Sequence, residues 1–253
     1  MRTIALIGLL LLSLSAALQA TILIVIQTGQ DVLLAADTAE TRTWPGGART
    51  RAQTCKIDQL GDMVFAWAGI TGFAQTDFDV RTAVRVTFDR TVPMDIAVPR
   101  LGETLRPLFE RTLVAMLAAG MSLESDNLWF AVHLVRPSHP TKSPVAWTLR
   151  LRATLDQHGV PHATVRAQEA PRDEFFGTLG TRDELVRAVK DGTVQIPWDG
   201  NLPDRLTAVQ KMIAVQASAT PDRVGLPMDA VLVTSTGVKW MTPRFECIIR
   251  YDL

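Results

Sequence analysis

Two apolar runs, Thr21-Ile-Leu-Ile-Val-Ile-Gln27 and Val32-Leu-Leu-Ala-Ala36, decide the fold of this 253-residue chain. Both are apolar on both faces and rich in residues that favour strands, so they predict strands buried from two sides. Thr28-Gly29-Gln30-Asp31 lies between them and supplies a turn glycine. We therefore expect the two strands to form a hairpin in the middle of a sheet.

The remaining pattern extends this hairpin into a larger α+β protein. Apolar periodicity and turn residues predict four strands, two helices, four strands, two helices and closing strands. Strands are expected at residues 55–60, 63–68, 128–136, 146–155, 162–167, 174–178, 230–234, 238–241 and 246–251, and helices at 72–88, 100–119, 181–189 and 202–217. A polar loop is expected over residues 38–53, and Pro107 predicts a kink or a late start in the second helix. Tight turns favour antiparallel sheets, and two stacked sheets with a helix layer on each outer face make a four-layer αββα sandwich.

Composition excludes several classes of function. The chain carries 26 basic and 26 acidic residues, and no segment concentrates positive charge, so nothing favours a nucleic-acid partner. Neutrality near pH 7 favours self-association, which suggests a homo-oligomer. The four histidines lack metal-ligand spacing, and we find no nucleophile elbow, phosphate loop or dinucleotide fingerprint. We therefore expect no metal and no cofactor.

The first 20 residues have the layout of a bacterial secretory signal peptide. A basic start is followed by an apolar run at residues 4–12 and by small residues up to Ala20. Cleavage after Ala20 or after Ala17 is compatible with this pattern, as is an uncleaved anchor. Export to the periplasm or the medium is expected, with no membrane contact after cleavage. Cys55 and Cys247 could then pair, or both could remain buried thiols.

Three stretches together carry a resemblance to a known family. Thr21 precedes Asp37 by sixteen positions, Lys56-Ile57-Asp58 leads into a strand ending at Gly69, and residues 224–241 contain Val224-Gly-Leu-Pro-Met-Asp229 and two apolar strands. This pattern resembles proteasome β-type subunits, which belong to the N-terminal nucleophile hydrolases. The resemblance implies a single domain over residues 21–253 and a threonine peptidase or amidohydrolase acting on a peptide or a small amide.

The resemblance also implies a role for each matching residue. Thr21 would be the nucleophile once residues 1–20 are removed, with its own α-amine as base. An α-amine has an ordinary pKa of about 7.7–8.0, which suits a base at neutral pH. Lys56 would keep that amine neutral, Asp37 would orient Lys56, and the Gly69 N–H would stabilise the oxyanion. Asp222 would support the amine from the end of a late helix.

The sequence departs from the family at supporting positions. Gly225 stands where the family has a serine, and Thr178 or Thr181 is the nearest equivalent of a second serine. A second hypothesis is therefore a catalytically silent proteasome-like subunit with an assembly or binding role. The N-terminus of the mature protein discriminates the two, because a chain that starts before Thr21 has no free threonine amine.

Overall fold

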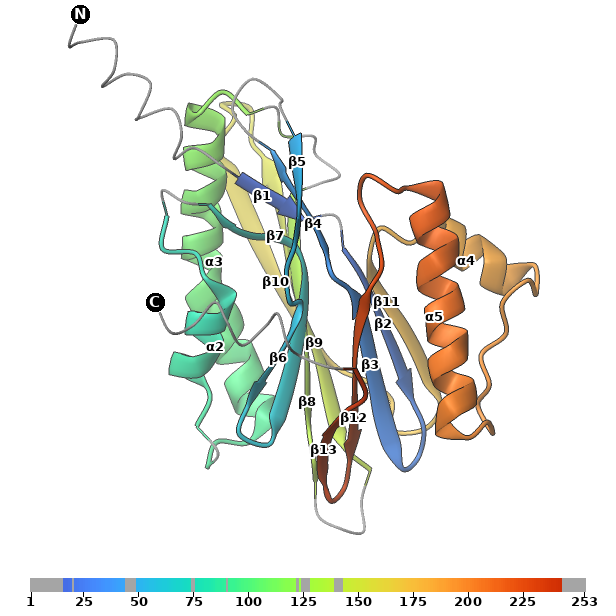
Figure 1. Ribbon diagram of the computed structural model, residues 1–253. Coiled ribbons are helices and arrows are strands. Elements are labelled where there is room, and N and C mark those ends of the chain that lie inside the picture. Colours follow the sequence, from blue (N-terminus) through green and yellow to red (C-terminus); the bar gives the residue numbers. More distant parts are fainter. Residues whose placement is uncertain are drawn as a thin grey trace, which may run out of the picture.

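The computed structural model describes residues 16–242, except 20, 44–48, 74–75, 90, 122, 124–127 and 139–142. Over this part the chain is an α+β protein with two antiparallel sheets and four helices (Figure 1). No helix of these residues is long and apolar enough to cross a membrane.

The smaller sheet has five strands and is built around the predicted hairpin. Its order is β11-β2-β3-β12-β13. The strands are β2 (Ile22–Gln27), β3 (Asp31–Asp37), β11 (Phe175–Gly180), β12 (Met228–Thr234) and β13 (Gly237–Trp240). Leu23 pairs with Ala36 and Gln27 with Val32, so the expected hairpin is confirmed.

The larger sheet has eight strands. Its order is β10-β9-β8-β7-β1-β4-β5, and β6 also pairs with β7. The strands are β1 (Ala16–Gln19), β4 (Ala39–Thr43), β5 (Arg49–Gln53), β6 (Ile57–Leu60), β7 (Met63–Phe73), β8 (Trp129–Arg136), β9 (Val145–Leu155) and β10 (Pro161–Glu169). β1 belongs to the segment expected to be removed, and in the full-length chain it lies between β7 and β4.

Three apolar clusters hold these elements together. The first joins α2 (Val80–Thr87) and α3 (Met94–Ala118) to one face of the eight-stranded sheet. The second contains residues from both sheets. The third joins α4 (Asp183–Lys190) and α5 (Leu202–Ala219) to one face of the five-stranded sheet. Figure 1 shows the same order from left to right: α2 and α3, the strands, then α4 and α5.

The structure corrects three expectations. Residues 38–53 are not one loop, because β4 and β5 pair with each other and Ala16 of β1 pairs with Thr43. The helix expected over 72–88 is shorter, since β7 continues to Phe73 and α2 begins only at Val80, after its N-cap Asp79. The late start at Pro107 is wrong.

α3 begins at Met94 and runs through both Pro99 and Pro107. Its buried residues lie on both sides of Pro107, with Leu101 and Leu105 before it and Phe109 after it. Packing on the sheet therefore outweighs the backbone hydrogen bond that each proline removes. The strand expected at residues 246–251 lies outside the described residues.

Candidate active site

Thr21 lies immediately before β2 and is completely buried in the full-length chain. Its Oγ1 has no hydrogen-bond partner among the described residues. Its carbonyl oxygen accepts a hydrogen bond of 2.9 Å from the N–H of Thr181. A buried hydroxyl without a partner is uncommon, and it marks Thr21 for a functional explanation.

The predicted partners Asp37 and Lys56 meet next to Thr21. Lys56 Nζ lies 2.8 Å from Asp37 Oδ1, and both side chains are completely buried. The same Oδ1 accepts a hydrogen bond of 2.9 Å from the N–H of Ile22, the residue after Thr21. Lys56 Nζ also donates to the carbonyl oxygen of Ala39. Asp37 therefore links the lysine ammonium to the backbone beside the threonine.

Asp37 is stabilised as a carboxylate from several directions. Burial raises the pKa of its carboxyl, and the Lys56 ammonium and the N–H groups of Ile22 and Gly225 oppose that rise. Gly225 donates to Oδ2 over 3.2 Å. Gly225 has no side chain, so its contribution to this network is made by the backbone.

Gly69 lies on β7, at the point where β1 ends; β1 is here called the leader strand because its removal is expected. It has φ +96°, and a Cβ there would collide with the carbonyl oxygen of Trp129. In the sheet Gly69 pairs with Phe130 on one side and with Gln19 of β1 on the other. The peptide bond before Thr21 lies within two residues of that pairing. The structure thus brings Gly69 into the neighbourhood of Thr21.

Asp222 occupies a different environment. It lies in the turn after α5, its carboxylate is 60% exposed, and its Oδ2 lies 3.8 Å from Arg223 Nε. Its exposed carboxylate is therefore not part of the buried group around Asp37 and Lys56. Thr178 is buried and its carbonyl oxygen accepts from Arg182 Nη1 at 2.9 Å.

Sequence reasoning missed the part played by Gly180. It is the last residue of β11, pairs with Ile22 and has φ +94°. A Cβ on Gly180 would collide with the carbonyl oxygen of Thr21. Only glycine allows β11 to approach Thr21 this closely. The signal in the sequence is the second glycine of the run Gly177-Thr-Leu-Gly-Thr181, which ends an apolar strand.

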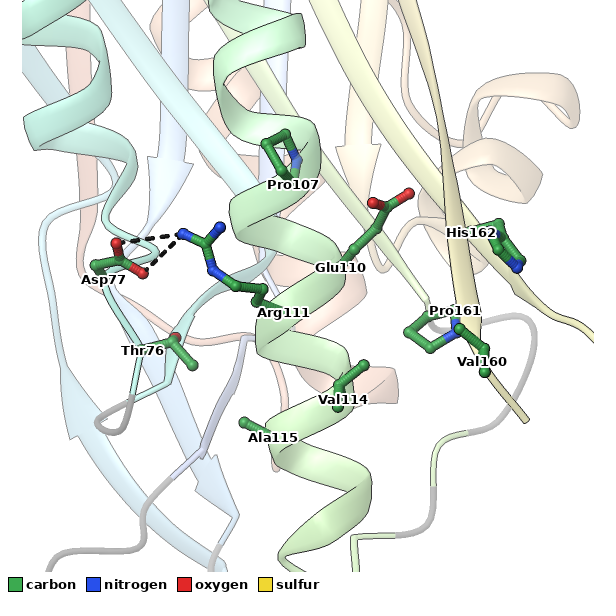
Figure 2. Close-up of a pocket in the computed structure, with 10 residues that line it drawn as sticks. All are labelled: Thr76, Asp77, Pro107, Glu110, Arg111, Val114, Ala115, Val160, Pro161 and His162. Atoms are coloured by element: carbon green, nitrogen blue, oxygen red, sulfur yellow. Dashed lines mark hydrogen bonds and ion pairs between the residues drawn. The ribbon is translucent and has the colours of Figure 1, made fainter. Parts of the chain in front are cut away.

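Other features of the chain lie apart from this group. Figure 2 shows an open hollow between α3 and the start of β10, lined by residues such as Glu110, Val114 and Val160, and none of the predicted site residues lines it. Across the described ranges, no three His, Cys, Asp or Glu side chains are grouped to hold a metal ion. Cys55, the residue before Lys56, is disulfide-bonded, and the chain's other cysteine, Cys247, lies outside the described residues.

Comparison with known proteins gives no independent assignment. No protein-family model and no curated protein matches this sequence.

Proposed function

We propose that this chain is an exported N-terminal threonine hydrolase that cleaves peptide or related amide bonds after residues 1–20 are removed. The observation that carries the proposal is the completely buried Lys56–Asp37 pair, hydrogen-bonded to the backbone one residue after Thr21. Burying two charges is costly, and such pairs gather where a protein tunes reactive groups. Here the adjacent group is a threonine whose hydroxyl has no partner in the described part of the chain.

The first half-reaction is acyl transfer to Thr21. The free α-amine of the mature chain takes the hydroxyl proton while Oγ1 attacks the carbonyl carbon of the scissile amide. The resulting oxyanion is stabilised by backbone N–H donors, for which Gly69 is the proposed source. When the C–N bond breaks, the amine passes its proton to the leaving nitrogen, and Thr21 is left as an ester.

The second half-reaction restores the enzyme. A water molecule attacks the ester carbonyl, and the α-amine takes one of its protons. Collapse of the second oxyanion breaks the ester bond, returns the proton to Oγ1 and releases a carboxylic acid. Lys56 contributes by its positive charge, which disfavours protonation of the amine, and Asp37 holds Lys56 in position.

The leader strand supports a peptide-like substrate. β1 pairs with β7 through Gln19 and Leu18, and with β4 through Ala16. Its removal leaves unpaired edges on β7 and β4. An extended peptide could add as a strand between them, with backbone hydrogen bonds supplying affinity. The acyl part of the substrate would then follow the path of β1 and present its carbonyl near Gly69.

Two further observations support the wider proposal. Helices on the outer faces of two sheets with a shared apolar cluster suit the four-layer αββα sandwich of N-terminal nucleophile hydrolases. An oxidised Cys55 suits an oxidising compartment such as the periplasm or the medium. The homo-oligomer stays a prediction.

The decisive experiment is N-terminal sequencing and intact-mass measurement of the mature protein, followed by labelling with an epoxyketone peptide. We expect a chain that begins at Thr21 and gains the mass of the probe. Thr21→Ala with the same N-terminus should not be labelled, because this electrophile needs both the hydroxyl and the free amine. A mature chain that begins at Leu18 or Met1, unlabelled, would instead favour the silent subunit with an assembly or binding role.

A further inference from the structure

Three arginines gather beside the candidate active site, and none of them forms an ion pair within the described part of the chain. Arg150 on β9 pairs in register with Arg166 on β10. Arg150 also pairs with Ala131, which belongs to the apolar cluster between the two sheets, so Arg150 and Arg166 lie on the face that looks toward the five-stranded sheet. Arg182 follows the end of β11 and approaches from that second sheet.

Arg150 lies close enough to Arg166 and to Arg182 for their charges to act on its guanidinium. Burial and then the charges of Arg182 and Arg166 lower the pKa of the Arg150 guanidinium. All three residues are nevertheless exposed to solvent. An anion bound among them would relieve the repulsion that solvent leaves unscreened.

Two carboxylates in the neighbouring segments pair with other arginines. Among the described residues, no carboxylate lies within ion-pair distance of Arg150, Arg166 or Arg182, whereas Glu169 pairs with Arg172 at 3.0 Å and Glu184 with Arg187 at 2.6 Å. Asp183, next to Arg182, lines a shallow hollow on α4 with Arg187 and Lys190. The group, here called the arginine triad, therefore makes no ion pair with a described carboxylate.

The arginine triad flanks the site on the side away from the leader strand. Gly69 pairs with Phe130, and Phe130 pairs with Leu151, the neighbour of Arg150. Two strand spacings place this part of β9 about 10 Å from Gly69. β1 lies on the other side of β7. Arg182 lies two residues after Gly180, whose backbone touches the Thr21 carbonyl.

A substrate whose acyl part follows β1 cannot place that part against the arginine triad, because β7 and β8 lie between them. The segment that departs as the free amine has no such constraint. Arginine forks bind carboxylates with paired, charge-assisted hydrogen bonds. The chemistry that fits the triad is therefore a carboxylate on the leaving side of the scissile bond.

We propose that Arg150, Arg166 and Arg182 select substrates with a carboxylate on the first or second residue after the cleaved bond. This inference rests on the proposed function and specifies its substrate class: acidic peptides or amides, with the charge on the leaving amine. The carboxylate can be an Asp or Glu side chain or a free C-terminus.

The test compares matched peptides on the mature enzyme. One set of peptides carries Asp, Asn or Lys directly after the scissile bond and has an amidated C-terminus. In the second set the residue after the scissile bond is the last residue, and it ends either as a free acid or as an amide. In at least one set we expect kcat/KM to be about 10- to 100-fold higher for the peptide with the carboxylate than for its neutral counterpart. The set that shows the preference tells whether the recognised carboxylate is a side chain or a free C-terminus. The preference should shrink as salt is raised. Equal kcat/KM values throughout both sets would overturn the proposal.

Variants assign the preference to the arginine triad. Arg150→Gln and Arg182→Gln should each reduce the ratio of the Asp to the Asn substrate, and the double variant should bring it close to one. Arg187→Gln, which removes an arginine paired with Glu184, is the matched control and should leave the ratio unchanged. An equal loss in Arg187→Gln would contradict a specific role for the triad.

Binding separates this proposal from the proposed function. Thr21→Ala protein that begins at residue 21 can be titrated with acidic and amidated leaving-side peptides by calorimetry. Tighter binding of the acidic peptide, lost in Arg150→Gln, supports the triad even if no peptide is hydrolysed. Hydrolysis without any such difference in binding or in kcat/KM keeps the threonine hydrolase and rejects the triad.

Discussion

The two ends of β3 carry the same residue in two different settings. Asp31, at the start of the strand, binds both Nη atoms of Arg205 on α5, at 2.5 and 2.8 Å. Asp37, at its end, binds Lys56 Nζ at 2.8 Å. The Asp31 side chain is 15% exposed, whereas that of Asp37 is fully buried.

The two aspartates differ in their remaining hydrogen bonds. Asp31 accepts a further bond of 2.8 Å from Thr28 in the hairpin turn, so the pair fastens α5 to the hairpin and closes the turn. Asp37 joins no helix to the sheet; it accepts from backbone N–H groups beside Thr21 and at Gly225. A structural role accounts for the Asp31–Arg205 pair. The Asp37–Lys56 pair places two buried charges next to the candidate nucleophile. This contrast underlies the predictions below.

The largest effect is expected from Asp37→Asn. It leaves the Lys56 ammonium buried without a carboxylate, which should lower the free energy of unfolding by about 3–5 kcal/mol. Epoxyketone labelling and peptide hydrolysis should fall by about 100-fold or more, because the base at Thr21 loses its support. Urea unfolding measures the first effect and single-turnover labelling the second.

The double variant Asp37→Asn/Lys56→Met separates stability from activity. It removes both charges and should recover most of the lost stability, since well-packed apolar replacements of buried ion pairs are tolerated. Activity should stay low. Recovery of activity together with stability would show that the pair serves only the fold.

A smaller effect is expected from Asp31→Asn. Arg205 would keep an amide partner and some solvent, so the free energy of unfolding should fall by about 1–3 kcal/mol. Labelling of Thr21 should proceed at the wild-type rate under conditions where the variant is folded. A matching loss of labelling would remove the distinction between the two ends of β3.

The smallest effect is a pH dependence at Asp31. Burial opposes ionisation, but hydrogen bonds from Arg205 and Thr28 hold the pKa of this carboxyl below its usual value. The stabilisation it provides is therefore complete above the unfolded pKa of about 3.9 and is lost as the pH falls through the folded pKa. The difference in melting temperature between wild type and Asp31→Asn should stay constant down to about pH 5 and narrow as the pH falls below about 4. A constant difference would show that the Arg205 bond does not depend on the charge of Asp31.

The central hairpin could be predicted from sequence because its residues are apolar on both faces, which leaves few alternatives to a buried strand. β4 and β5 could not, since their Thr, Arg and Glu residues look like a loop. Their pairing with each other, and with the leader segment through Ala16, became visible only in the assembled sheet.

In the candidate site, too, some residues could be predicted from the sequence and others could not. The spacing of Thr21, Asp37 and Lys56 is short-range, and the structure brings the three together. Gly180 and Gly225 contribute through backbone groups, and Gly225 meets Asp37 from 188 positions away. Nothing in their local sequence indicates which buried atom they approach.

The place of β1 in the eight-stranded sheet has a consequence for timing. While residues 16–19 remain in the sheet, the Thr21 nitrogen is part of a peptide bond, and β1 occupies the space between β7 and β4 where a substrate strand would bind. On the proposed function, a single cut would create the base and clear that path in the same event. The full-length chain would therefore be a zymogen that is inactive toward other proteins at the site of its synthesis and becomes active only after export.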